Sequence, residues 1–117
     1  IKFAPEEGYI VGYKDVTEDE FWVRGHIPGR PIMPGVIMCE AAAQLCSYYF
    51  KRCTRDDRFL GFGGMQNVKF RGQVLPGQRL YLIAQNTDLR TRRAMFNTQG
   101  VVESRIVFEA VIIGMPV

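Results

Sequence analysis

Residues 34 to 52 constrain the fold of this 117-residue chain more than any other stretch. Apolar side chains occupy nearly every side of a helix drawn through it: Val36, Ile37, Met38, Cys39, Ala41, Ala42, Ala43, Leu45, Cys46, Tyr48, Tyr49 and Phe50. Proline is favoured in a first helical turn, and Lys51 and Arg52 suit the negative end of a helix. A helix that is apolar all round belongs in the interior of a domain. The sequence therefore predicts a helix from residue 34 or 35 to about 52, wrapped by other elements.

The rest of the chain supplies the wrapping. Stretches rich in β-branched and aromatic residues predict strands at 9–16, 59–70, 79–89, 93–102 and 104–114, with a short extended piece at 21–25. Residues 75–78 and 90–93 predict turns. One buried helix and a meandering antiparallel sheet curled around it make an α+β fold. The length fits one domain over residues 1–117.

Composition excludes several classes of function. The net charge of +3 is too small to indicate nucleic-acid binding. The sequence also lacks a stripe of basic residues interleaved with aromatic ones. No apolar run approaches the roughly 20 residues that a membrane helix needs, and no secretory signal is visible. Because the chain begins with Ile1, we expect an N-terminal element of the fold to be missing.

Three cysteines, Cys39, Cys46 and Cys53, are spaced seven residues apart along the predicted helix. Each lies roughly 10 Å of axial rise from the next, whereas a disulfide needs Cα atoms within about 7 Å. Free thiols indicate a reducing compartment, so we expect a cytoplasmic protein. No second cysteine or histidine cluster is present to complete a metal site.

A carboxylate interrupts the apolar helix. Glu40 precedes Gln44 by four residues, which places the two on one face. A carboxylate buried there must find a hydrogen-bond partner or take up a proton. Two interpretations stay open from the helix alone: a structural glutamate that reaches a capping donor or the sheet edge, and a functional acid.

The only histidine, His26, precedes a loop that proline keeps out of helical conformation. Pro28, Pro31 and Pro34 hold residues 27–34 extended or turned, and deliver the chain to a helix N-terminus at Gly35. Free backbone N–H groups at such a terminus bind a negative oxygen. Neutral imidazole suits proton abstraction near neutrality, and a desolvated glutamate suits proton donation. A base, an acid and an oxyanion site can therefore share one cleft.

The segment HIPGRPIMPGVIMCEAAAQ resembles the active-site segment of the bacterial 3-hydroxyacyl-[acyl-carrier-protein] dehydratases. The shared pattern is His-x-Pro-Gly-x-Pro-x-x-Pro-Gly followed by Glu-Ala-x-x-Gln, with His26 and Glu40 fourteen residues apart. EFWVRGH, NVKFRGQVLPGQRL and SRIVFEAVIIG extend the resemblance over nearly the whole chain in outline. Ile27 stands where the family usually has phenylalanine, and the family's N-terminal helix and strand have no counterpart. The isomerising branch has aspartate at the position of Glu40, so the resemblance favours the non-isomerising type.

This resemblance implies a hot-dog fold, in which a curved antiparallel sheet wraps one long central helix. It also implies a homodimer in which His26 of one subunit faces Glu40 of the other. Whether dimers assemble further into a trimer of dimers stays open.

The implied reaction is dehydration of a 3-hydroxyacyl thioester to the trans-2-enoyl thioester in fatty-acid biosynthesis. His26 would be the base, Glu40 the acid, and Gly35 and Val36 the substrate-binding residues, without a metal or organic cofactor. The substrate would arrive on the phosphopantetheine of acyl carrier protein, and its acyl chain would lie in an apolar tunnel beside the helix. Five basic residues are candidates for docking that acidic carrier: Lys69, Arg71, Arg90, Arg92 and Arg93.

Two other functions remain open for a hot-dog protein. A thioesterase also uses a helix carboxylate and a helix N-terminus, but it activates water and generally lacks the histidine and proline loop. A non-catalytic subunit that only binds acyl carriers would be expected to have lost His26 or Glu40, and both are present.

Overall fold

The computed structural model describes residues 2–4, 7–17, 20, 33–54, 60–90 and 92–116. These residues form one helix and six strands: β1 (Lys2–Ala4), β2 (Tyr9–Asp15), α1 (Gly35–Thr54), β3 (Leu60–Phe70), β4 (Arg79–Leu89), β5 (Ala94–Val102) and β6 (Arg105–Pro116). The predicted helix and five long strands are confirmed, with boundaries shifted by no more than a few residues. The short strand β1 was not predicted, and the extended piece expected at 21–25 lies outside the described residues.

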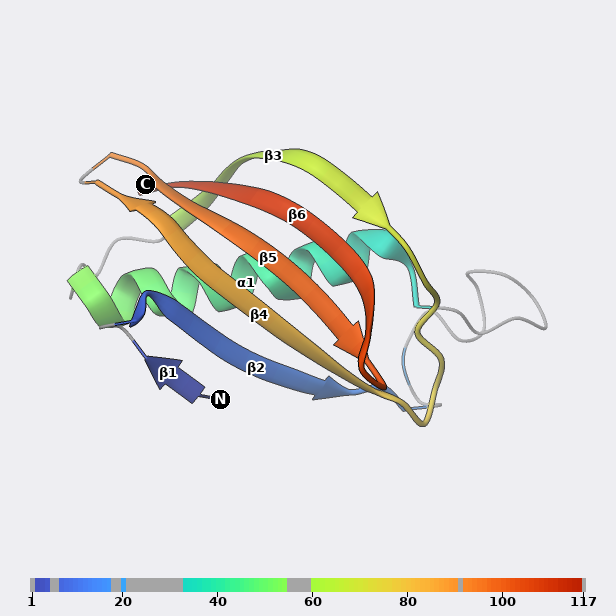
Figure 1. Cartoon of the computed structure of the whole chain (residues 1–117). Coiled ribbons are helices and arrows are strands. Elements are labelled where there is room, and N and C mark those ends of the chain that lie inside the picture. The colour runs from blue at the N-terminus through green and yellow to red at the C-terminus, as the bar shows by residue number, and fades with distance from the viewer. Residues whose placement is uncertain are drawn as a thin grey trace.

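The strands form one antiparallel sheet in the order β1-β2-β4-β5-β6-β3. Only β4, β5 and β6 follow one another as the predicted meander. Between β2 and β3 the chain passes through α1, and these two strands pair with opposite sides of that meander (Figure 1). The sheet consequently curves across one side of the helix, as the figure shows.

The core lies between the concave face of this sheet and α1. Alternate residues of β5 are buried, and Phe96, which stands opposite Ile112 of β6, meets Tyr49 of α1 edge to face at 5.5 Å between ring centroids. The buried helix residues recur every three or four positions: Met38, Ala42, Leu45, Cys46, Tyr49 and Phe50. That spacing marks one face of a helix packed on a sheet.

The curved sheet covers one side of α1, as predicted, and described side chains on the opposite face of the helix are exposed (Figure 1). Val36 is 73% exposed, and Tyr48 is 38% exposed. The described sheet ends at β1 and β2 on one side and at β3 on the other. Within the described part of the chain, no strand pairs with the outer edge of β3.

The predicted turn before β4 is confirmed. The Gln78 amide donates to the Leu75 carbonyl at 3.1 Å, and Gly77 has a φ of 92°. Proline at the second position and a left-handed glycine at the third define a type II turn. This turn joins β3, which pairs with β6, to β4, which lies on the other side of the meander from β6.

Candidate active site

The N-terminus of α1 presents two backbone donors. The Pro34 carbonyl accepts hydrogen bonds from the amides of Ile37 (3.0 Å) and Met38 (3.4 Å), which makes Pro34 the cap and Gly35 the first helical residue. Among the described residues, no backbone carbonyl accepts a hydrogen bond from the amide of Gly35 or Val36. The positive end of the helix dipole lies at the same place. This terminus can therefore bind a negatively charged oxygen.

An aromatic ring lies against Gly35. A Cβ atom there would lie 2.7 Å from both Cε1 and Cζ of Phe70, the last residue of β3. Phe70 is itself 54% exposed and stacks at a tilt on Phe108, with 5.6 Å between ring centroids. Sequence reasoning did not assign Phe70 to the site, although the stretch 67–80 that contains it carried part of the resemblance. The aromatic ring gives the helix N-terminus an apolar flank.

Glu40 lies one to two turns further along α1, roughly 8 Å of axial rise from Gly35. The carboxylate is exposed, and its Oε1 accepts a hydrogen bond of 2.9 Å from Nε2 of Gln44. Glu40 and Gln44 therefore lie on one face of the helix, as predicted. The prediction that Glu40 is buried is wrong for the single chain. Both residues point away from the sheet, since Met38, Ala42 and Leu45 occupy the packed face.

A groove of about 420 Å³ begins at Glu40 and runs between α1 and the β3–β6 edge. The helix contributes Gln44, Ser47 and Lys51, which follow Glu40 at helical spacing on one face. The opposite wall, from β3 and β6, is apolar and consists of Leu60, Gly61, Ile112, Ile113 and Gly114. Glu40 and Lys51 are about 16 Å apart along the helix axis. The open helix face therefore joins the carboxylate to a long groove with one apolar wall.

His26 and the proline-rich loop from 27 to 32 lie outside the described residues. The facing of His26 and Glu40 therefore stays a prediction. Of the four site residues predicted from sequence, the structure brings Gly35, Val36 and Glu40 onto the first two turns of α1.

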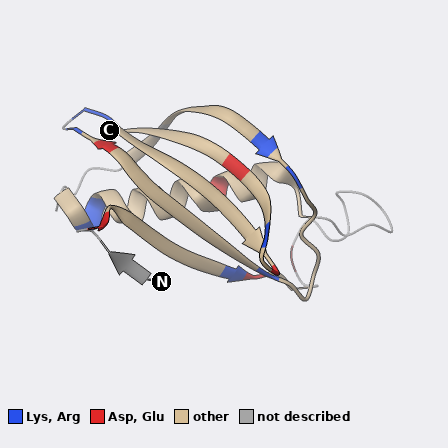
Figure 2. Cartoon of the chain, viewed as in Figure 1, with Lys and Arg blue, Asp and Glu red and all other residues tan. Residues whose placement is uncertain are grey.

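The five basic residues expected to dock an acidic partner fall into two groups at opposite ends of the sheet (Figure 2). Lys69 and Arg71 lie at the end of β3 that flanks the N-terminus of α1, and Nε of Arg71 pairs with Glu109 at 2.5 Å. The other group, Arg90, Arg92 and Arg93, lies at the β4–β5 turn. The five residues cannot form one docking patch, and only Lys69 and Arg71 adjoin the candidate site.

At the β4–β5 turn, two of the arginines bind an aspartate. Asp88 accepts hydrogen bonds from Nη2 of Arg93 (3.0 Å) and Nε of Arg90 (3.1 Å). The hydrogen bond from Arg93, followed by that from Arg90, lowers the pKa of Asp88. Part of the positive charge of this turn is therefore neutralised locally.

All three cysteines lie on α1 and are free thiols, as expected. Burial raises the pKa of the Cys46 thiol. Such a thiol is unreactive as a nucleophile, so Cys46 serves packing. No helix among the described residues has the length and apolar character to cross a membrane.

A curved antiparallel sheet around one long helix defines a hot-dog protein, and solved structures of low sequence identity share this fold. One is TTHA0967 of Thermus thermophilus, a hypothetical protein and thioesterase superfamily member (TM-score 0.77, 13% identity, covering 93% of this chain and 80% of that one). Another is a putative thioesterase from Ralstonia eutropha, described as phenylacetic acid degradation-related (0.80, 11%, 98% and 81%). The dehydratase heterocomplex ApeI:P from Xenorhabdus doucetiae is a third (0.73, 19%, 95% and 90%).

Sequence comparison narrows this class to one family. The family model of the FabA-like domain matches residues 3–111. The 3-hydroxyacyl-[acyl-carrier-protein] dehydratase FabZ of Clostridium botulinum is 36% identical over 110 residues, covering 90% of this chain and 74% of the relative. The enzyme of the same name from Geobacter metallireducens is 36% identical over 104 residues, covering 86% and 69%. The chain therefore belongs to the FabA-like family.

Proposed function

We propose that this chain dehydrates 3-hydroxyacyl-[acyl-carrier-protein] thioesters to trans-2-enoyl thioesters in fatty-acid biosynthesis. One observation carries the proposal: a helix whose N-terminal amides can bind an oxyanion also places the Glu40 carboxylate at the start of a long groove. Membership of the FabA-like family and 36% identity to enzymes named for this activity support it.

The reaction breaks one C–H bond and one C–O bond, and it forms the second bond of a C=C pair and one O–H bond of the released water. His26 takes the proton from C2, the carbon next to the thioester carbonyl, and the Gly35 amide donates to the enolate oxygen. Val36 adjoins this oxyanion position. Glu40, oriented by Gln44, gives a proton to the C3 hydroxyl, which leaves as water. No electron acceptor is needed, so the proposal includes no metal or organic cofactor beyond the phosphopantetheine that carries the substrate.

The amide of Gln44 orients the proposed acid, so we expect Gln44→Ala to lower kcat for dehydration by about tenfold, matching a hydrogen bond of about 1 to 1.5 kcal/mol. KM for the thioester should change little, because Gln44 acts through Glu40. Ser47→Ala, on the same helix face and in the same groove, is the matched control. Equal kcat in Gln44→Ala and the unaltered protein would remove Gln44 from the mechanism.

The open face of α1 and the free edge of β3 support a homodimer in which the second copy supplies His26 to Glu40. The eleven residues of β3 leave a row of backbone groups without a strand partner in the described chain, and a second β3 can pair with them. A two-fold axis there makes two identical sites, each built from both subunits. Further assembly into a trimer of dimers is left open.

Mixing two inactive variants tests the shared site. His26→Ala and Glu40→Gln, refolded together in equal amounts, should recover about a quarter of the unaltered activity, because half of the dimers are mixed and each restores one site. Each variant refolded alone is the control. Sites built within one subunit would give no recovery.

The activity is tested by following both possible products from one 3-hydroxyacyl thioester. The absorbance of the conjugated enoyl thioester reports dehydration, and a thiol reagent reports hydrolysis. Enoyl formation without thiol release supports the dehydratase. Thiol release without enoyl product would identify a thioesterase. Tight binding of the acyl thioester with formation of neither product would identify a non-catalytic subunit. The free thiols of α1 support a cytoplasmic setting for the reaction.

A further inference from the structure

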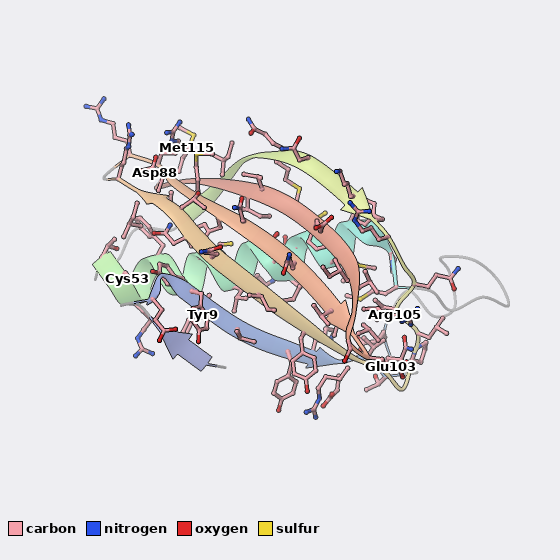
Figure 3. The ribbon with its side chains drawn as sticks, in the orientation of Figure 1. Tyr9, Cys53, Asp88, Glu103, Arg105 and Met115 are labelled. Atoms are coloured by element: carbon pink, nitrogen blue, oxygen red, sulfur yellow. The ribbon has the colours of Figure 1, made fainter. Side chains whose placement is uncertain are left out.

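The groove has a direction that the fold determines. Phe70 at the end of β3 meets Gly35 at the start of α1, so β3 and α1 run antiparallel and the start of β3 lies toward the end of the helix. Figure 3 places Cys53 near the end of α1 and Met115 near the end of β6 at the same end of the molecule, opposite Glu103 and Arg105. The groove therefore leads from Glu40 toward the end where β3 begins.

At that end, two residues of neighbouring strands are fitted to each other. A Cβ atom on Gly114 of β6 would lie 2.6 Å from Cγ, 2.7 Å from Cδ2 and 2.9 Å from Cδ1 of Leu60, the first residue of β3. The Leu60 side chain thus occupies the space that glycine leaves empty. Leu60 is only 6% exposed and still lines the groove, as Gly114 does. The packed pair forms part of the apolar wall at the distal end.

We propose that the packing of Leu60 on Gly114 closes the groove and sets the longest acyl chain that the enzyme accepts. The inference rests on the proposed function, in which the acyl chain extends from the reacting carbons near Glu40. A side chain at residue 114 would displace Leu60. Because Leu60 is nearly buried and lines the groove, the displaced side chain would move into the groove and shorten it. A shorter side chain at residue 60 would instead lengthen the groove.

The test measures kcat/KM for dehydration of a series of 3-hydroxyacyl N-acetylcysteamine thioesters that differ only in chain length. We compare kcat/KM for chains longer than the optimum of the unaltered protein with kcat/KM for short chains. Leu60→Ala should raise this long-to-short ratio by about tenfold, which is the effect of one methylene in an apolar pocket. Gly114→Ala should lower this ratio by a similar factor. In the double variant, the new methyl group at residue 114 meets a shortened side chain at residue 60, and the length profile should move back toward that of the unaltered protein.

Gly64→Ala is the matched control. It adds a methyl group to the same strand, β3, but its Cβ would meet only Cδ1 of Ile113 at 4.0 Å, an ordinary contact. Its length profile should be that of the unaltered protein. Thermal unfolding of each variant separates loss of fold from change of specificity, and Leu60→Ala alone decides the test if Gly114→Ala does not fold.

The outcomes separate the two proposals. If Leu60→Ala is folded and dehydrates every chain length in the same proportions as the unaltered protein, the length determinant is overturned and the dehydratase stands. If the unaltered protein forms no enoyl product from any chain length, the proposed function fails and the length determinant with it.

Discussion

Replacing His26 by alanine is expected to lower kcat/KM for dehydration by about 10²- to 10⁴-fold, because a positioned proton acceptor contributes a factor of that size. The rate of enoyl-thioester formation measures the effect, and the reverse hydration of a crotonyl thioester offers a second readout.

The His26→Ala protein should remain folded, since α1 and the sheet form a hydrophobic core among the described residues. Thermal unfolding and far-ultraviolet circular dichroism provide this control. A folded His26→Ala protein with the activity of the unaltered protein would refute the assignment of His26 as the base.

Replacing Glu40 by glutamine is expected to lower kcat by about 10²- to 10⁴-fold as well, because the amide keeps the shape of the side chain but cannot donate the proton that the leaving hydroxyl needs. Stability should hardly change. In the single chain Glu40 is exposed and its described partner is Gln44, and substitutions at such positions stay within about 0.5 kcal/mol.

Glu103→Gln is the matched control for Glu40→Gln. Glu103 is also exposed, but it lies at the β5–β6 turn, outside the groove (Figure 3). The two variants should unfold at similar temperatures and differ only in turnover. Equal turnover in both would show that Glu40 is not the acid.

Local patterns predicted most of the secondary structure. The bounds predicted for β4, residues 79–89, are those observed, because turn residues flank a run of alternating buried and exposed positions. The start of α1 at Gly35 was predicted from the proline before it. Such signals are local: they depend on residues within a few positions of one another, which the sequence displays directly.

Pairing between distant strands could not be predicted in the same way. The position of β3 beside β6, instead of beside β4, depends on contacts between residues 38 to 56 positions apart, such as Met65 opposite Ile112. The resemblance supplied the type of fold, but neither periodicity nor composition contains this order of strands. The groove depends on it, since β3 and β6 form the apolar wall.

By itself, the sequence determined the residue types available for the chemistry and their order along the chain: one imidazole, a stiff loop, a helix start with glycine, and an acid followed by an amide. Only the tertiary structure decided which side of the helix stays open. Both faces of α1 carry apolar residues, so their periodicity cannot tell which face the sheet covers. Because the curved sheet packs on Met38, Ala42 and Leu45, Glu40 is left exposed at the head of a groove.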